Sequence, residues 1–414
     1  MESVTKIGDL KWGAEIALPT SRPLSKSAHF VGGRYPCRSV AYVPRLLLQN
    51  KFPHNNEHTV LDPFMGSGTT AIEASKNAKS VYGVEIDPYA RLVAAVSTTR
   101  YGHDELAELE TIIQKILVEG RNVQADQQLQ PDLKNVEYWF DEQNYDDLLR
   151  LKTSIRKLAK SGKQHDFLMT AFGDIIRACS KAERQSLKPY ISKKYTKTPK
   201  LVFDEFARIA PKYITAVSRN ISNSSEGIIW LGDDATDFRL DGGVDIAITS
   251  PPYINAMDYT RCIKLESAWI GTANDSVIKF VRSRQLGESV RRHSMVESDV
   301  IGKLCKDSFS SLQDLDPIRY QTAVAFFEDM KNNLLSVKQA LKTGGQYYII
   351  IGNSKIRGIE IPTHEILAKI GLAVGFEWDS YFHYRIRDHR TSIPRGDRGG
   401  KIDFEHVIGL TAPK

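Results

Sequence analysis

The sequence has little cysteine, and its four cysteines, Cys37, Cys179, Cys262 and Cys305, include no CxxC pair. That spacing argues against a zinc site or a disulfide framework and fits a reducing cytoplasm. The ten histidines show no metal-ligand spacing, so we expect no bound metal. No apolar run approaches the roughly 18 residues of a membrane span, and the N-terminal residues do not resemble a secretory signal. We therefore expect a cytoplasmic protein that does not enter a membrane.

The overall charge is also nearly balanced, with 56 Lys or Arg against 50 Asp or Glu in 414 residues. The imbalance is local. From Arg150 to Lys200 there are 14 basic and 3 acidic residues, a net +11 that leaves −5 for the rest of the chain. Such a segment indicates a site for a polyanion, and a solvated helical surface is the alternative interpretation. As phosphate contacts we select Lys193, Lys194, Lys197 and Lys200.

The chain alternates strand and helix patterns at both ends and has a helical pattern between them. Strand-like residues 59–61, a glycine turn, a helix and a second strand at 80–85 form the opening βαβ unit of a doubly wound sheet. Strand patterns return at 228–231 and 244–249. The last two, at 376–386 and 406–410, predict closing antiparallel strands. The fold class is therefore α/β, with a mostly parallel sheet and an antiparallel last strand.

These patterns divide the chain into three parts. Residues 1–100 form the first part of the α/β domain, and residues 227–414 form the second. Between them, residues 101–226 are predicted to be a helical insertion that carries the basic segment, because apolar residues recur there at helical spacing. A smaller insertion, expected to be irregular, covers residues 272–317.

The glycine turn Asp62-Pro63-Phe64-Met65-Gly66-Ser67-Gly68-Thr69-Thr70 follows the first strand. Glycines there let the backbone approach a ligand, and the next helix offers free N–H groups. Glu85 ends the following strand, where an acidic side chain can accept both ribose hydroxyls of an adenosine cofactor. We interpret the turn as a nucleotide-type cofactor site. A purely structural turn, or a nicotinamide or flavin enzyme, remains an alternative.

A second motif, Thr249-Ser250-Pro251-Pro252-Tyr253, follows an apolar strand. Two successive prolines fix the backbone in a rigid turn. The turn presents the Ser250 hydroxyl and the Pro251 carbonyl as acceptors, with the ring of Tyr253 beside them. This combination is suited to hold a planar heterocycle that carries an amino group, with Tyr253 stacked on the ring.

The segments LDPFMGSGTT, VYGVEIDP and TSPPY together resemble the S-adenosylmethionine-dependent amino-group DNA methyltransferases, whose TSPPY form is most often seen in the cytosine-N4 branch. The resemblance covers residues 27–100 and 228–414. It implies a Rossmann-like methyltransferase sheet with S-adenosylmethionine as cofactor. It places the cofactor on Asp62, Phe64, Gly66, Gly68, Thr69, Thr70 and Glu85, with its adenine amine on Asp233 or Asp234. The target base would lie on Ser250, Pro251, Pro252 and Tyr253.

The same resemblance implies a function. The protein would methylate the N4 amine of cytosine in double-stranded DNA of a bacterium or archaeon, as the modification enzyme beside a separately acting restriction endonuclease. Both insertions would share target recognition. Apart from the resemblance, the segment from Arg385 to Lys401 has six basic and two acidic residues, and we predict further phosphate contacts there at Arg385, Arg387 and Arg390. Adenine-N6 methylation is the nearest alternative. An RNA or protein methyltransferase and a non-catalytic DNA-binding relative remain open.

Overall fold

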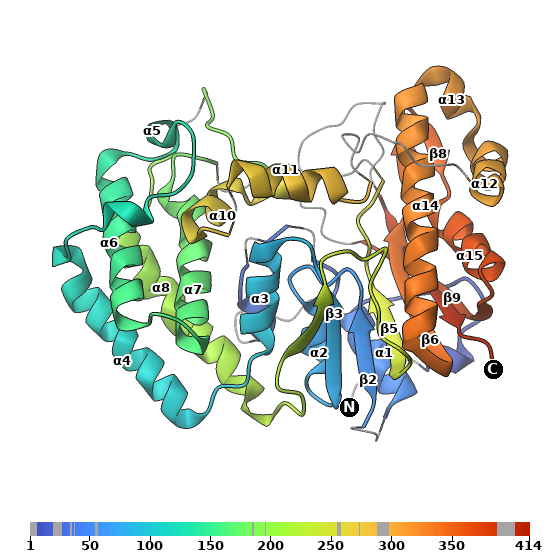
Figure 1. Cartoon of the computed structure of the whole chain (residues 1–414), viewed down its shortest axis with the longest axis horizontal. Helices are drawn as coiled ribbons and strands as arrows, with labels where there is room; N and C mark the ends of the chain where they lie inside the picture. Colours follow the sequence, from blue (N-terminus) through green and yellow to red (C-terminus); the bar gives the residue numbers. More distant parts are fainter. Residues whose placement is uncertain are drawn as a thin grey trace.

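The computed structural model describes residues 6–19, 27–33, 35–36, 38–53, 57–183, 186–194, 196–254, 258–272, 274–287, 298–386 and 402–414. Its centre is an eight-stranded sheet in the order β1-β9-β10-β6-β5-β2-β3-β4 (Figure 1). The strands are β1 (Ala14–Ile16), β2 (Thr59–Asp62), β3 (Ser80–Val84), β4 (Ile228–Gly232), β5 (Val244–Thr249), β6 (Leu341–Gly352), β9 (Glu377–Arg385) and β10 (Phe404–Thr411). A separate hairpin joins β7 (Ser354–Ile356) to β8 (Ile359–Ile361).

The sheet has the predicted doubly wound, mostly parallel topology. β10 is antiparallel to both β6 and β9, and the other neighbouring strands pair in parallel. The chain runs outward from β2 through β3 to β4, and then returns to place β5 on the other side of β2. In such sheets a ligand binds beyond the carboxyl ends of the strands where the order reverses. Here that point lies between β2 and β5.

Helices cover both faces of the sheet because its central strands are apolar on both faces. Val60, Ile246 and Ile248 pack with α1 (Tyr42–Lys51) and α2 (Thr69–Ala74). On the opposite face, Leu61 and Ala247 belong to the core that α14 (Pro317–Ala340) and α15 (Thr363–Ala373) complete. The alternation along β2 and β5 follows from the two-residue period of a strand.

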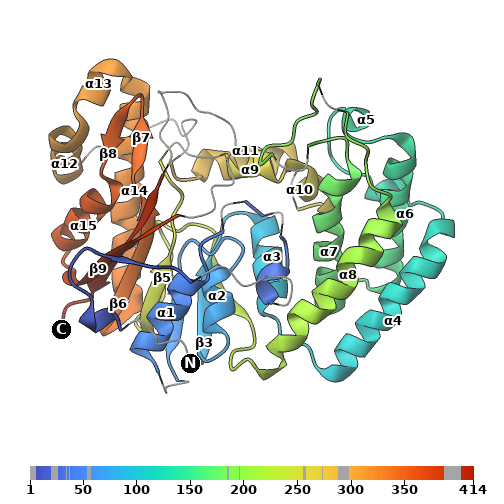
Figure 2. The same ribbon diagram turned by 180° about the vertical axis from the view of Figure 1, so that it is seen from behind.

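The segment predicted to be a helical insertion contains helices and no strand among its described residues. They are α4 (His103–Glu119), α5 (Val136–Trp139), α6 (Glu142–Leu158), α7 (Lys163–Cys179) and α8 (Val202–Val217). Figures 1 and 2 show them on one flank of the molecule, beyond α3 (Pro88–Thr98). Their apolar core also includes the fully buried Trp269 of α10 (Lys264–Ile270), which packs against α7. The helical part therefore shares its core with a later segment of the chain.

The prediction that residues 272–317 are irregular was wrong. They contain α11 (Asp275–Arg284), α12 (Asp299–Phe309) and α13 (Ser311–Leu315), and the short α9 (Tyr259–Cys262) precedes them. The side chain of Asn274 caps α11 by accepting a hydrogen bond from the Val277 amide at 2.9 Å. Both ribbon views show α11 lying between the helical flank and α14. Short helices with many charged residues give a weak apolar pattern, so the caps carry most of the signal.

The remaining regular elements are short 3₁₀ turns. They are η1 (Ile7–Asp9), η3 (Ala28–Phe30), η4 (Gly120–Asn122), η5 (Gln127–Leu129) and η6 (Ser218–Ser222). Within the described ranges no helix is both long and apolar enough to cross a membrane. In the same ranges no three His, Cys, Asp or Glu side chains lie together as a metal site would require.

Candidate active site

The glycine turn lies at the carboxyl end of β2 and leads directly into α2. Gly66 and Gly68 have positive φ angles of 52° and 83°, which residues with a Cβ rarely adopt. A Cβ at Gly68 would also lie 2.9 Å from the Cβ of Ala94 in α3. Gly68 therefore lets α3 pack closely behind the turn. As a result, the start of α2 and its free N–H groups are held at the carboxyl edge of the sheet.

Glu85, immediately after β3, connects the glycine turn to α3. Its Oε2 accepts a hydrogen bond from the Gly66 amide at 2.6 Å, and its Oε1 accepts one from the Asp87 amide at 2.8 Å. Asp87 caps α3 by accepting from the amides of Tyr89 and Ala90, at 2.8 and 3.0 Å. Burial raises the pKa of Glu85 to about 7, and the charges of Asp87 and Asp62 contribute to the rise. Burial also raises the pKa of Asp62 and of Asp87 to about 6.

Asp62 links the glycine turn to the second motif. Its Oδ1 accepts from the Thr249 hydroxyl at 2.6 Å and from the Phe64 amide at 3.0 Å. The contact forms because β2 and β5 are parallel neighbours, so that Asp62 and Thr249 both end their strands at the same edge. The two motifs are thus joined by a buried hydrogen bond between residues that are 187 positions apart in the chain.

The second motif is a turn with its four residues in different environments. Ser250 and Pro252 line a cavity, whereas the Pro251 ring is buried. The half-buried Tyr253 is not among the cavity-lining residues, and its hydroxyl donates a hydrogen bond to Oε1 of Glu405 in β10. Burial, followed by the charge of Glu405, raises the pKa of Tyr253 well above its usual value. The tyrosines that do line the cavity are Tyr35 and Tyr259.

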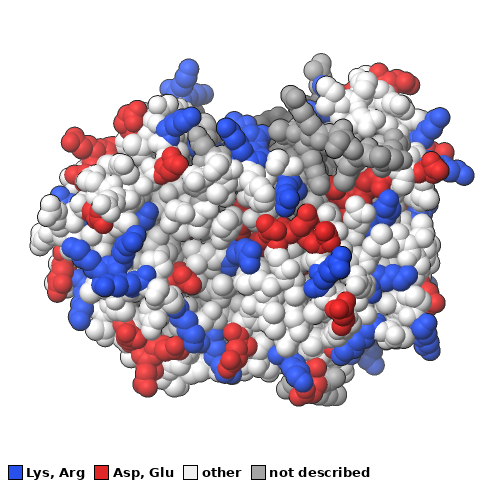
Figure 3. Space-filling view, viewed as in Figure 1, with Lys and Arg blue, Asp and Glu red and all other residues white. Residues whose placement is uncertain are grey.

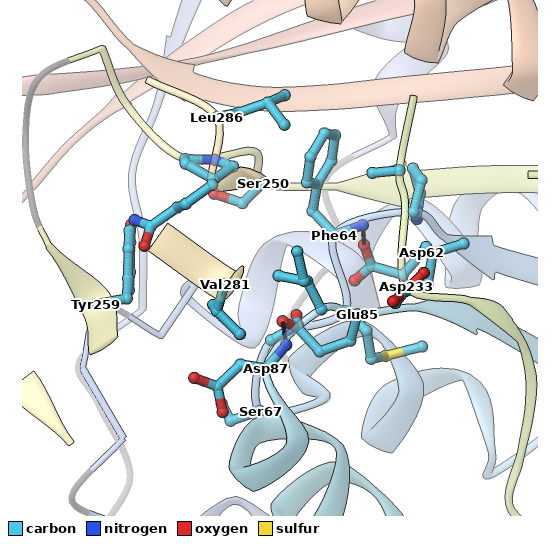
Figure 4. A pocket seen from close by; sticks show the side chains of 18 of the residues that line it. Asp62, Phe64, Ser67, Glu85, Asp87, Asp233, Ser250, Tyr259, Val281 and Leu286 are labelled. Carbon is cyan, nitrogen blue, oxygen red and sulfur yellow. Dashed lines mark hydrogen bonds between the residues drawn. The ribbon is translucent and has the colours of Figure 1, made fainter. Parts of the chain in front are cut away.

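One cavity receives residues from both motifs. It encloses about 970 Å³, counted with its opening to solvent. Figure 4 shows Asp62, Phe64, Ser67 and Glu85 along one side of it, with Ser250 and Tyr259 toward the other. Gly66, Thr69, Asp233 and Asp234 also line it. Gly68 and Thr70 do not, because Gly68 faces α3 and the Thr70 hydroxyl donates to the Ile248 carbonyl at 3.4 Å.

Comparison with known proteins gives the same family as these motifs. The model of a family described as DNA methylase, of the N6/N4 type, matches residues 24–95. The type II methyltransferase M.MvaI of Kocuria varians is 23% identical over 335 residues, which cover 75% of this chain and 73% of that protein. The type II methyltransferase M.BsoBI of Geobacillus stearothermophilus is 25% identical, over 64% of this chain and 57% of that protein. The chain is therefore similar to the N4/N6 amino-group DNA methyltransferases, through the family model over residues 24–95 and through these relatives over a larger part of its length.

A solved structure from Thermus thermophilus, described as a DNA modification methylase, is also similar to part of this chain. It is 16% identical over 28% of this chain and 51% of that chain, with a TM-score of 0.18. A match of that size carries no argument. The fold assignment therefore rests on the sheet order and strand directions given above.

The two aspartates after β4 have different partners. Oδ1 of Asp234 accepts from the amide and the hydroxyl of Thr236, at 2.9 and 2.6 Å. Asp233 is exposed, and no hydrogen bond to its carboxylate is found among the described residues. Figure 4 shows Asp233 at the cavity, on the same side as Asp62. Of the two, Asp233 therefore has the free acceptors.

The assignment of Lys197 as a phosphate contact needs correction. Its Nζ donates to the carbonyls of Arg177, Ser180 and Ala182, each at 2.7 Å. An ammonium group has three donors, so these bonds use all of them, and Lys197 stabilises the end of α7.

Other basic residues of the segment, half-buried in the structure, also donate hydrogen bonds to the backbone. Lys152, Lys181 and Arg150 donate to the carbonyls of Leu129, Glu137 and Arg121, respectively. Acidic and basic side chains are mixed over the helical flank on the face shown in Figure 3. Part of the +11 segment is therefore internal to the fold.

The other predicted phosphate contacts are exposed or lie outside the described residues. The side chains of Lys193, Lys194 and Lys200 are exposed. Arg385 ends β9, has a side chain that is 60% exposed, and lies 4.5 Å from the ring centre of Phe404. Arg387 and Arg390 lie outside the described residues.

Several cavity residues were not expected from the sequence. Arg38, Asp87, Val281 and Leu286 all line the cavity. Asp87 could have been found, because Asp followed by Pro88 is the pattern of a helix N-cap at the edge where Glu85 lies. Val281 and Leu286 come from α11 and the residues just after it, and no local pattern places them there.

Proposed function

We propose that this protein transfers a methyl group from S-adenosylmethionine to the N4 amine of cytosine in duplex DNA. The observation that carries the proposal is that the Gly66 turn and the Ser250 turn line a single cavity at the switch point of the sheet. A cofactor on the first turn and an amine on the second would therefore meet. Enzymes of this family generally use S-adenosylmethionine, and the cavity has the groups to hold it.

The cofactor fits the donors and acceptors on this side of the cavity. Amides of the glycine turn and the start of α2, near Thr69, would receive its carboxylate. Glu85 would accept its ribose hydroxyls, and Asp233, which has free acceptors, would accept its adenine amine. Asp62 and Phe64 would lie beside its methionine end, where a carboxylate favours a cation. Gly66, Gly68 and Thr70 would shape the turn. When bound, S-adenosylmethionine supplies a methyl group that the sulfonium already activates.

The acceptor amine is the harder part of the reaction, because its lone pair is shared with the ring. Hydrogen bonds from its two N–H groups to the Ser250 hydroxyl and the Pro251 carbonyl would localise that lone pair. Pro252 fixes the carbonyl direction. Catalysis would then be positioning and electrostatics, with the proton lost to solvent after transfer. In duplex DNA the base must first leave the stack. Tyr253 and Tyr259 are the aromatic side chains nearest in sequence that could hold it.

The DNA phosphates would be bound by exposed basic residues in two parts of the chain. The helical part would contact the target DNA through Lys193, Lys194 and Lys200. Arg385, at the end of β9, would contact the phosphate backbone of the DNA. The type II relatives support a role beside a restriction endonuclease acting on the same site, in a bacterial or archaeal cytoplasm. Cytosine is preferred over adenine because the turn has the TSPPY form, which starts with Ser250.

The test is incubation of the protein with labelled S-adenosylmethionine and unmethylated genomic DNA, followed by mass spectrometry of the digested nucleosides. We expect N4-methylcytosine. We also expect Ser250→Ala to lose most activity while it binds the cofactor as the wild type does. N6-methyladenine in the product would contradict the choice of cytosine but keep the mechanism. Full activity in Ser250→Ala would contradict the mechanism, and the absence of any methylated base would contradict the function.

A further inference from the structure

Glu405 is a carboxylate held between two tyrosines at the start of β10. Its Oε1 accepts a hydrogen bond from the hydroxyl of Tyr253, and its Oε2 accepts one from the hydroxyl of Tyr384. Tyr384 is the residue opposite Glu405 on the antiparallel neighbour β9 and is fully buried. Glu405 also pairs with Gly352 of β6 on its other side. The carboxylate is thus fixed by the sheet on both sides. It presents one oxygen to the turn Ser250-Pro251-Pro252-Tyr253, which we call the catalytic turn.

Both tyrosines are permanent donors to this carboxylate. Burial raises the pKa of Tyr253 and of Tyr384 well above the usual value, and the charge of Glu405 adds to the rise. Each phenol therefore keeps its proton across the working pH range. Hydrogen bonds from a neutral donor to a carboxylate are about twice as strong as neutral pairs.

Few rotatable bonds lie between the Tyr253 hydroxyl, which Glu405 holds, and the hydrogen-bond acceptors of the turn. Tyr253 directly follows Pro251 and Pro252, whose φ angles are fixed by their rings. Holding the Tyr253 side chain therefore limits where the Pro251 carbonyl and the Ser250 hydroxyl can point. At the other end of the turn, Thr249 is held by Asp62 at 2.6 Å. The catalytic turn is therefore anchored at both ends, to Asp62 of β2 and to Glu405 of β10.

The backbone of Tyr253 is packed as tightly as its side chain. Gly287, just after α11, has a φ angle of 75°, and a Cβ there would lie 2.8 Å from the Tyr253 carbonyl oxygen. The chain after α11 therefore lies so close to this peptide that a residue with a Cβ would not fit at Gly287. In this arrangement the ring of Tyr253 is not among the residues that line the cavity, whereas Tyr259 is.

We infer that Glu405 is a positioning residue for the methyl transfer, which acts by anchoring the catalytic turn through the hydroxyl of Tyr253. The inference rests on the proposed function and deepens it. A displacement of about 1 Å in the acceptors can cost on the order of 100-fold in rate, so a fixed turn matters for the chemical step. If Tyr253 served only to stack on the base, its hydroxyl and Glu405 would have no part in the rate.

The experiment compares Tyr253→Phe, Glu405→Ala and the double variant. Tyr253→Phe keeps the ring and removes only the hydrogen bond. We expect kcat to fall about 10- to 100-fold, as for the loss of one charge-assisted hydrogen bond, with the Kd for S-adenosylmethionine unchanged. Because both single variants remove the same bond, the double variant should be no slower than the slower single one. Glu405→Gln, which keeps one acceptor oxygen, should recover part of the rate.

Tyr348→Phe is the matched control. Its hydroxyl donates to Oδ2 of Asp379, so the change removes another buried phenol–carboxylate bond of the same sheet. Thermal unfolding should be affected similarly in Tyr348→Phe and Tyr253→Phe, but only the second should lose kcat. Wild-type kcat in Tyr253→Phe, or equal losses of kcat in both variants, would overturn the inference. Additive losses in the double variant would overturn it too. If the wild type itself transfers no methyl group, the proposed function fails, and the inference with it.

Discussion

The carboxyl group of Glu85 holds the glycine turn in the structure, and in the proposed complex it also binds the cofactor. In the structure it accepts hydrogen bonds from the Gly66 and Asp87 amides, and in the proposed complex it also accepts from ribose hydroxyls. Its pKa of about 7, raised first by burial, places its titration near neutral pH. A protonated carboxyl has less acceptor capacity, so its titration should be visible in cofactor binding.

We predict that the affinity for S-adenosylmethionine rises with pH from 6.5 to 8. The ionised form is the better acceptor, so binding favours loss of the proton. Affinity should therefore fall as pH drops through about 7, by at most tenfold per pH unit. Titration calorimetry measures this directly. Glu85→Gln should bind more weakly and lose most of the pH dependence, and Glu85→Ala should bind about 10- to 150-fold more weakly. A wild-type pH profile in Glu85→Gln would disprove the ribose assignment.

At the scale of elements, α7 shows why a basic sequence does not by itself make a DNA-binding surface. The carbonyls at the end of a helix lack partners within the helix. Lys197, 18 residues beyond the last residue of α7, returns to bind the carbonyls of Arg177, Ser180 and Ala182. A lysine with this task and one that contacts phosphate look the same in the sequence.

Two sets of variants separate the two tasks. Lys197→Met should lower the free energy of unfolding by about 1–3 kcal/mol, since three buried carbonyls lose a donor. It should leave the salt dependence of DNA binding unchanged. Lys193→Ala with Lys194→Ala should leave thermal stability unchanged and flatten the log–log salt slope by about 0.9 for each phosphate that is no longer neutralised. Chemical denaturation and fluorescence anisotropy at several salt concentrations measure the two effects. An unaltered slope in the second pair would return this segment to a solvated surface.

At the scale of the whole molecule, a buried ion pair joins the helical flank to the segment after the catalytic turn. Arg177 of α7 and Glu266 of α10 have side chains 5% and 1% exposed, and their closest atoms are 3.3 Å apart. Arg177 also donates to the Cys262 carbonyl at 2.5 Å. The pair lies in the part of the structure where Trp269 completes the helical core. The two parts of the chain are therefore held together by charge as well as by apolar packing.

Arg177→Met should destabilise the protein strongly, by about 3–5 kcal/mol, because it leaves the Glu266 carboxylate buried without its partner. Adding Glu266→Leu should recover much of that loss, since the unpaired charge is then gone. Urea denaturation monitored by circular dichroism gives both values. If Arg177→Met alone unfolds at the wild-type urea concentration, the pair contributes nothing to holding the two parts together.

The sequence by itself determined the fold class and the two motifs that build the cavity. Gly66 and Gly68 could be placed because a strand-to-helix turn needs positive φ angles, and Glu85 because it ends the adjacent strand. Ser250 to Tyr253 could be placed because two prolines at a strand end fix a turn. These are local properties, which depend on neighbours along the chain.

The tertiary structure alone decided which side chains those motifs meet. Glu405 lies about 150 residues from Tyr253, Asp62 lies about 190 from Thr249, and Leu286 enters the cavity from α11's end. The pairing follows from which strands become neighbours in the sheet, and that is set by the packing of the whole chain. The partners of Lys197 were also decided by the tertiary structure. They are backbone carbonyls, which every residue has, so no sequence pattern indicates which of them the lysine binds. Charge and hydrogen-bond donors are visible in a sequence, but their acceptors become neighbours only once the chain has folded.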